Sequence, residues 1–220
     1  MSDWKHPTGK APKNVVLVCL GASHADYIAS ASARDTPDWL LNAHEVWTLN
    51  RGSLVFKADC TFALDYLDGE AAHFPGYAAM LHRQKTPLIT SKAGPDWPAH
   101  VSEYPFKAVW NWLMTEVKPN HQEWLINSVP LILLYAAYIG VKNMIIFGAD
   151  YQGHSQKEDG ASCLSYWIGV LERIGVKVQS PDSSQLLGGG HHFVYGFPVD
   201  GDPRPDAVAR RARFKELINA

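Results

Sequence analysis

The residue whose type and position best suit acid–base chemistry is His154. It lies in a short loop, Gln152-Gly153-His154-Ser155, between an apolar segment that we expect to be a strand and a segment that we expect to be a helix. An imidazole with an ordinary pKa of about 6.5 can take a proton from a hydroxyl group at neutral pH. His154 is therefore a candidate general base, and the alternative is a solvated loop residue.

A second pair of imidazoles, His191-His192, follows the glycine triplet 188–190. Such a loop could close over a ligand and contact its phosphate. A metal site is not expected, because adjacent side chains of an extended chain point apart and neither cysteine nor carboxylate stands at ligand spacing nearby.

Polar residues follow several apolar segments. They are Gly21-Ala22-Ser23, Asn50, Asp65 and Gly148-Ala149-Asp150. In an open parallel sheet, ligands bind outside the carboxyl ends of the strands. Gly21 would allow the backbone to turn sharply, and free amide groups at the start of the following helix could bind a phosphate. The segment is neither a GxGxxG fingerprint nor a P-loop. The alternative is that Gly21 only ends a strand, and Asn50 and Asp65 could likewise be ordinary turn residues.

The elements that must position these residues follow from the apolar pattern. We expect strands at 15–20, 45–49, 60–64, 87–90, 144–147 and 176–179, and helices at 24–34, 128–139, 161–174 and 206–219, with a short helical piece at 37–42 and near-helical aromatic spacing at 106–114. The helix at 128–139 has Asn127 and Ser128 to cap its start and Gly140 to end it. Alternation of apolar strands with helices predicts an α/β fold of Rossmann type with a mostly parallel sheet.

Length and composition are those of one globular domain. A chain of 220 residues with 46% hydrophobic and 19% charged residues suits a single α/β domain over 1–220, with a polar arm at 1–14 and a C-terminal helix in 203–220. The net charge of -2 argues against nucleic acid as a partner but leaves a local basic patch open. The three cysteines are widely spaced and the sequence has no signal peptide, which predicts a cytoplasmic protein. A membrane span is not expected, because no apolar run reaches about 18 residues. The sequence leaves the oligomeric state open.

Several of these motifs resemble those of bacterial sialyltransferases of lipooligosaccharide biosynthesis, and of related Rossmann-type proteins that include the 6-hydroxymethylpterin diphosphokinases. Gly21-Ala22-Ser23 stands where the sialyltransferases have a Gly-Asn-Gly-Pro-Ser loop, and Asn50 matches an asparagine that contacts the nucleotide. Asn127-Ser128 resembles their Thr-Ser-Gly helix start, and Gly148-Ala149-Asp150 their Gly-Ile-Asp. His154-Ser155 resembles the segment that carries their catalytic histidine.

The chain also departs from that pattern. The Gly21 loop lacks the second glycine and the asparagine, and Gln152 stands where the family has a phosphate-binding tyrosine, with Tyr151 adjacent. Asp65 stands where the sialyltransferases tend to have asparagine, and a carboxylate repels a nucleotide phosphate unless a metal intervenes.

The resemblance implies a transferase that moves a sugar from a CMP- or UDP-linked donor to a hydroxyl acceptor and needs no cofactor. His154 would be the general base, and Tyr151 or His192 would steady the leaving phosphate. The nucleotide would be bound by Gly21, Ala22, Ser23, Asn50, Asp65, Ser128, Gly148 and Asp150, with His191 and His192 in a lid.

Two alternatives remain open from the sequence. One is a diphosphokinase-like phosphotransferase that uses ATP and Mg²⁺, with Asp65 or Asp150 near the metal. The other is a nucleotide-binding protein without catalysis, in which His154 is a surface residue.

Overall fold

The computed structural model describes residues 5–32, 43–65, 74–93, 97–120, 124–151, 157–181, 183–184 and 186–187. His154, His191, His192 and the helical segments expected at 37–42 and 206–219 lie outside these residues.

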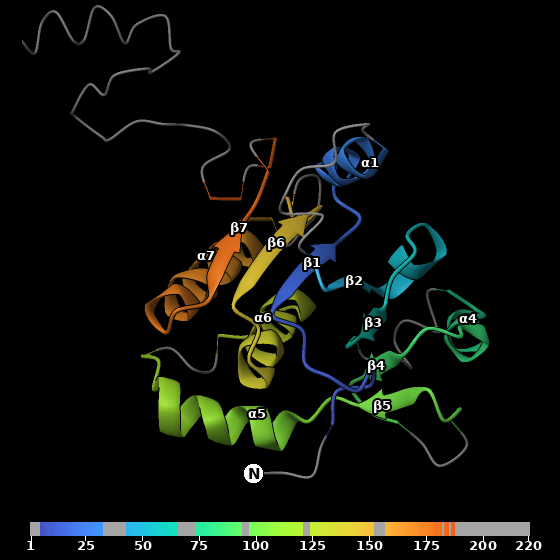
Figure 1. Ribbon diagram of the computed structural model, residues 1–220, viewed down its shortest axis with the longest axis horizontal. Coiled ribbons are helices and arrows are strands. Elements are labelled where there is room, and N and C mark those ends of the chain that lie inside the picture. The colour runs from blue at the N-terminus through green and yellow to red at the C-terminus, as the bar shows by residue number, and fades with distance from the viewer. Residues whose placement is uncertain are drawn as a thin grey trace, which may run out of the picture.

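The core of the fold is one sheet of seven parallel strands in the order β5-β4-β3-β2-β1-β6-β7 (Figure 1). The chain moves outward from β1 to β5 on one side and then crosses back to place β6 and β7 on the other side. The strand order therefore reverses between β1 and β6, which is where open α/β sheets form a crevice for ligands. The strands are β1 (Asn14–Val18), β2 (Glu45–Leu49), β3 (Cys60–Ala63), β4 (Leu88–Thr90), β5 (Val101–Glu103), β6 (Asn143–Phe147) and β7 (Lys177–Gln179).

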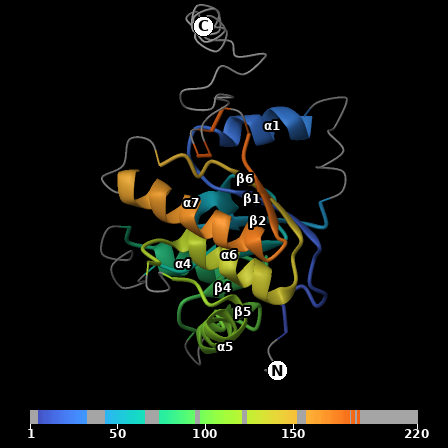
Figure 2. The same ribbon diagram turned by 90° about the vertical axis from the view of Figure 1, so that its left-hand side faces the viewer.

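Helices cover both faces of the sheet, as the α/β expectation requires. The helices α5 (Phe106–Trp112), α6 (Ser128–Ile139) and α7 (Lys157–Arg173) contribute to the large core on one face, and Figure 2 shows α6 and α7 lying across it. The helices α1 (His24–Ser32) and α4 (Tyr77–Arg83) contribute to two smaller clusters on the other face. A 3-10 turn, η1 (Asn50–Leu54), follows β2, and a π-helical turn, η2 (Leu113–Val117), extends α5.

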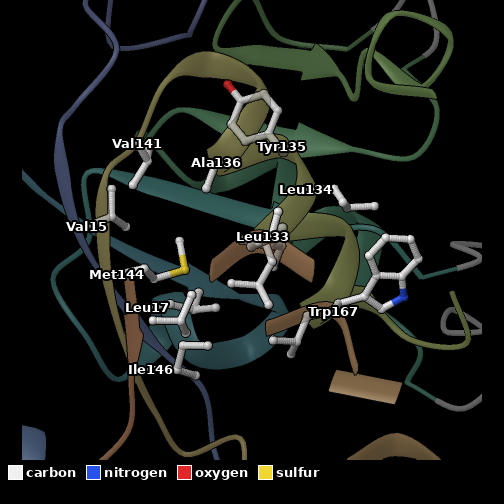
Figure 3. Close-up of a cluster of buried hydrophobic side chains, with 14 of the residues drawn as sticks. Val15, Leu17, Leu133, Leu134, Tyr135, Ala136, Val141, Met144, Ile146 and Trp167 are labelled. Carbon is white, nitrogen blue, oxygen red and sulfur yellow. The ribbon is translucent and has the colours of Figure 1, made fainter. Parts of the chain in front are cut away.

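The uninterrupted apolar run of β1 is explained by burial on both faces. Val15 and Leu17 belong to the α6–α7 core, whereas Val16 and Val18 belong to the α1 cluster. All four are at most 2% exposed. Figure 3 shows Leu17 near Leu133 of α6 and Val15 near Val141, within the cluster that also contains Trp167 of α7. A strand of this kind needs apolar residues at every position, which is typical of parallel sheets.

The start of α6 is fixed by a side-chain cap. Asn127 has extended backbone angles, and its Oδ1 accepts a hydrogen bond from the Val129 amide at 3.2 Å. Pro130 lies in the first turn, where its missing amide hydrogen costs no helical bond. Gly140 ends the helix with a φ of 97°. The expected helix at 128–139, its cap at Asn127 and its end at Gly140 are therefore confirmed, whereas Ser128 is the first residue of the helix and does not cap it.

The other predicted elements that fall within the described residues are confirmed, most with shifted ends. The strand at 45–49 has the expected bounds, the first strand ends at Val18 rather than at residue 20, and α7 begins at Lys157 rather than at residue 161. The sequence did not predict α4 or β5. The helix α4 is short and follows a glycine with a φ of 101°, and β5 is a three-residue edge strand in a proline-rich segment, so neither offers a readable periodicity.

A buried polar network closes the edge of the sheet opposite the strands' carboxyl ends. Glu45 is 8% exposed and accepts hydrogen bonds from Thr8 and, at 2.6 Å, from the indole of Trp47. The Nε2 atom of His6 lies 3.0 Å from Oε2 of Glu45, and Nδ1 lies 2.5 Å from the Tyr135 hydroxyl. Burial raises the pKa of the Tyr135 phenol, so the phenol is the donor to Nδ1, and Nε2 donates to Glu45. These bonds anchor the N-terminal arm.

Candidate functional site

The loops after β1 and β6 pack against each other at the point where the strand order reverses. The amide of Gly21 donates to the carbonyl of Gly148 at 2.7 Å. A Cβ added at Gly21 would lie 2.5 Å from that carbonyl oxygen, and one added at Gly148 would lie 2.4 Å from the carbonyl oxygen of Cys19. Both glycines are thus required for contact between the two loops, which supports the structural alternative weighed for Gly21.

A carboxylate already occupies the turn before α1. The amide and the hydroxyl of Ser23 both donate to Asp150, each at 2.7 Å, and the Ser23 hydroxyl oxygen accepts from the Gly148 amide at 2.8 Å. Ser23 and Asp150 are buried, whereas Ala22 beside them is exposed. The Ser23 amide, which the sequence suggested for a phosphate, is therefore bonded to Asp150, and the nearby negative charge disfavours an anion at this turn.

Asn50, Asp65 and Ser128 come together although they follow β2, β3 and the start of α6. The Asn50 amide nitrogen donates to Oδ2 of Asp65. The Ser128 hydroxyl donates to Oδ1 of Asp65 at 3.2 Å, and the Tyr77 hydroxyl donates to Oδ1 of Asn50 at 3.1 Å. We call these four residues the Asp65 cluster. Parallel strands bring their carboxyl ends to one edge, and this edge gathers the predicted residues.

Asn127 and Tyr151 form a second contact at the start of α6. The Tyr151 hydroxyl donates to Oδ1 of Asn127 at 2.8 Å. The Nδ2 atom of Asn127 is buried and has no hydrogen-bond partner among the described residues. Since Ser128 contacts Asp65 and Asn127 contacts Tyr151, the start of α6 links the loop after β3 with the loop after β6.

Tyr151 is held in a conformation that non-glycine residues seldom adopt. Its φ is 53°, and Asn50 has a φ of 51°. Positive φ is several-fold enriched in asparagine but uncommon for an aromatic residue, and such strain gathers at functional sites. The Tyr151 ring lies against Gly160 of α7, where an added Cβ would come within 2.7 Å of ring carbons. Burial also raises the pKa of the Tyr151 phenol, so the phenol is protonated at neutral pH.

The segment that leads into α6 is tied to α7 through one carbonyl group. The Trp124 carbonyl oxygen accepts from the Trp167 indole at 2.6 Å and from the Cys163 thiol at 3.1 Å. Trp167 and Cys163 are both 0% exposed. Cys163, Cys19 and Cys60 are all free thiols. The positions of Asn127 and Ser128 are thus set by the buried core.

Asp65 and Asp150 lie at separate places along this edge. They follow β3 and β6, which are three strand spacings apart, or about 14 Å at about 4.8 Å per spacing. Each carboxylate already bonds neighbouring polar groups. No group of three or more His, Cys, Asp or Glu side chains suited to a metal ion occurs within the described ranges.

Two further residues belong to this edge and were not predicted as site residues. Tyr77 bonds Asn50, and it lies at the start of α4, a helix that the sequence did not reveal. Asn127 was predicted only as a helix cap, but it also bonds Tyr151. Arg51 follows Asn50, is exposed, and places its guanidinium 5.1 Å from the centre of the Phe74 ring. Only the Asn-Ser pair before an apolar helix could have directed attention to Asn127.

Comparison with known proteins gives no match to a family or a curated sequence and a weak likeness to a solved structure. No protein-family model matches the chain, and no curated protein sequence matches it. A solved structure of the sialyltransferase CstII from Campylobacter jejuni, in complex with a substrate analogue, cytidine-5'-monophosphate, aligns with a TM-score of 0.47 and 13% identity over 91% of this chain and 99% of that chain. None of the described helices is both long enough and apolar enough to cross a membrane. At such low similarity, the function has to be inferred from the site residues themselves.

Proposed function

We propose that the protein is a transferase that binds a nucleotide-activated sugar and moves the sugar to a hydroxyl acceptor. The observation that carries this proposal is the meeting of Asn50, Asp65 and Ser128 at the carboxyl edge of the sheet, with Asn127 and Tyr151 beside them. These five residues come from four separate segments and present polar groups of both hydrogen-bonding types. The resemblance of the motifs to those of sialyltransferases supports the same reaction class.

The nucleotide-activated sugar lies along this edge, between the loop after β3 and the loop after β6. Asn50, Asp65 and Ser128 bind its hydroxyl-bearing part. The unpartnered Nδ2 of Asn127 and the hydroxyl of Tyr151 are hydrogen-bond donors for its phosphate. The turn at Gly21-Ala22-Ser23 contributes shape rather than amides, because Asp150 bonds the Ser23 amide.

The chemical step is a displacement at the anomeric carbon of the sugar. The acceptor oxygen forms a bond to that carbon while the bond to the phosphate oxygen breaks, and the bonding electrons leave with the phosphate. His154 takes the proton of the acceptor hydroxyl as general base. Tyr151, which remains protonated because burial raises its pKa, turns its hydrogen from Asn127 to the departing phosphate oxygen. A hydrogen-bond donor that is already in position, as the Tyr151 hydroxyl is, stabilises the negative charge that develops on the leaving phosphate.

A ligand panel tests the binding part of the proposal. Melting temperature is measured with CMP, UMP, UDP, GDP and ATP, each with and without Mg²⁺. A nucleotide at about 100 times its Kd stabilises the folded state by about 2.7 kcal/mol. Stabilisation by a pyrimidine nucleotide without Mg²⁺ is expected, and failure of every nucleotide to stabilise the protein would overturn the proposal.

A transfer assay then tests the reaction. The nucleotide that binds is supplied as its sugar conjugate with a panel of hydroxyl acceptors, and release of free nucleotide is followed. Release that depends on acceptor is the expected result. Binding without turnover of any conjugate would identify a nucleotide-binding protein without catalysis, and transfer of phosphate from ATP would identify the phosphotransferase alternative.

A further inference from the structure

Within the described part of the chain, the carboxylate of Asp65 is bonded by neutral donors only. It accepts hydrogen bonds from the amide of Asn50 and the hydroxyl of Ser128. Among the residues that the structure describes, no Lys, Arg or His side chain lies within ion-pair distance of Asp65, and the contact between His6 and Glu45 lies at the other end of β2. Asp65 is half-buried, which leaves its charge partly exposed.

The hydrogen-bonding capacity left in this cluster is mostly that of acceptors. A carboxylate has about four acceptor positions, and two are used by Asn50 and Ser128. Among the described residues, the Ser128 hydroxyl donates its hydrogen to Asp65, which leaves its lone pairs available. Asn50 donates one amide hydrogen to Asp65 and accepts from Tyr77 at its carbonyl oxygen, and its second amide hydrogen has no described acceptor. The cluster therefore presents several acceptors and one donor.

Hydroxyl groups match this pattern, because each can donate to a carboxylate and accept from an amide. An anionic group does not match it. Two like charges about 4 Å apart repel, which lowers affinity about fivefold even at the dielectric constant of water, and by more in a partly buried site.

We propose that Asn50, Asp65 and Ser128 bind the hydroxyl groups of an uncharged sugar ring and that the charge of Asp65 excludes an acidic group there. This inference rests on the proposed function and names the ligand chemistry of the same site. The ring is either the ribose of the nucleotide or the sugar that is transferred. Both sources share the hydroxyl chemistry, and the experiment below separates them.

The test measures Kd by calorimetry for matched ligands. One arm compares ribonucleotides with 2′-deoxyribonucleotides, which differ only at the ribose. The other arm compares UDP-glucose with UDP-glucuronate and GDP-mannose with GDP-mannuronate, and the members of each pair differ by one carboxylate. It also compares CMP with CMP-N-acetylneuraminate, which differ by the whole acidic sugar. For wild type we expect a preference of about fivefold or more for the neutral sugar, because like charges repel, for the ribonucleotide, because its 2′-hydroxyl bonds a charged group, or for both.

The variant Asp65→Asn keeps the shape of the side chain and removes its charge. It should reduce whichever preference wild type shows to about twofold or less. The matched control Asp59→Asn makes the same charge change at an exposed carboxylate at the start of β3, and it should leave every ratio unchanged. If only the deoxyribose ratio responds to Asp65→Asn, the ring is the ribose, and if only the acidic-sugar ratio responds, it is the transferred sugar.

A second measurement uses wild type alone, so that poor folding of Asp65→Asn leaves the proposal testable. Raising the salt concentration screens charges and should shrink the neutral-to-acidic ratio without changing the deoxyribose ratio. Absence of binding by any nucleotide would refute the proposed function itself. Binding of nucleotides with neither preference in wild type, or with preferences that Asp65→Asn does not change, would refute only the inference about Asp65.

Discussion

Ser128 donates its hydroxyl hydrogen to Asp65 at 3.2 Å, although 63 positions separate the two residues in the chain. Ser128 begins α6, and Asp65 follows β3. The bond joins the helix that precedes β6 to the other half of the sheet, across the point where the strand order reverses. It connects the start of α6, whose position is set by the buried core, to the Asp65 cluster.

Replacement of Ser128 tests this contact. We expect Ser128→Ala to weaken nucleotide binding about tenfold, because it removes a hydroxyl group and leaves Asp65 with one donor fewer. The free energy of unfolding should fall by only about 1 kcal/mol. Calorimetry and urea denaturation give the two values. The control is Ser165→Ala, on the exposed surface of α7, and an equal loss of affinity in that variant would contradict the assignment.

Replacement of His154 tests the general base. His154→Ala should lower the rate of transfer by about 10²- to 10⁴-fold, the usual contribution of a positioned base. Nucleotide affinity should be unchanged, because the imidazole serves the acceptor and not the donor. His191→Ala and His192→Ala are measured beside it, under conditions where chemistry limits the rate. Unimpaired transfer by His154→Ala would move the assignment to another group.

Treatment with a chelator tests the role of a divalent metal. We expect transfer to persist in EDTA, since Asp150 bonds Ser23, Asp65 bonds Asn50 and Ser128, and the two carboxylates lie on separate strands. Activity is measured before dialysis against EDTA, after it, and after readdition of Mg²⁺. Loss on dialysis and recovery with Mg²⁺ would favour the phosphotransferase alternative.

The contact between the β1 and β6 loops predicts a difference between two glycines. Gly148→Ala should destabilise the protein by about 2–5 kcal/mol, because its Cβ would lie 2.4 Å from the Cys19 carbonyl oxygen and its φ is 70°. Gly169→Ala, on the exposed face of α7 with nothing near the added Cβ, should stabilise it by about 0.5–1 kcal/mol. Denaturant titration of both variants measures the difference, and similar stabilities would argue against the observed loop packing.

The network around Glu45 predicts how stability depends on pH. Burial alone would raise the pKa of Glu45, but hydrogen bonds from His6, Thr8 and Trp47 outweigh it and the net pKa is lowered. A carboxyl group whose pKa is lower in the folded state stabilises the protein above its ordinary pKa, and this contribution is lost as the pH falls through the folded-state value.

Glu45→Gln removes that contribution. Wild type should be more stable than the variant by about 1–3 kcal/mol at neutral pH, with the difference shrinking as Glu45 becomes protonated. Urea denaturation between pH 3 and pH 7 measures it. The control Asp59→Asn changes an exposed carboxylate one strand away. A difference that stays constant across this range would show that Glu45 does not titrate as described.

The sequence by itself determined the parallel α/β architecture. The doubly buried run of β1, the strand at 45–49, and the α6 helix between Asn127 and Gly140 each have a local physical cause, either an apolar period or a capping residue. Parallel strands then had to bring their polar ends to one edge, so the sequence also indicated that Asn50 and Asp65 would lie close together. Ser128 was added to them only by the resemblance to sialyltransferases.

The partners of those residues were decided by the tertiary structure alone. Whether the Ser23 amide faces a ligand or Asp150, and whether Asp65 holds Ser128 or a metal, depends on how loops 127 and 63 positions apart approach each other. Gly21 was similarly ambiguous, because a glycine that admits a phosphate and one that admits another backbone look the same in a sequence. Hydrogen bonds between distant loops depend on angles and on distances of a few tenths of an ångström, and no local pattern of residues encodes these.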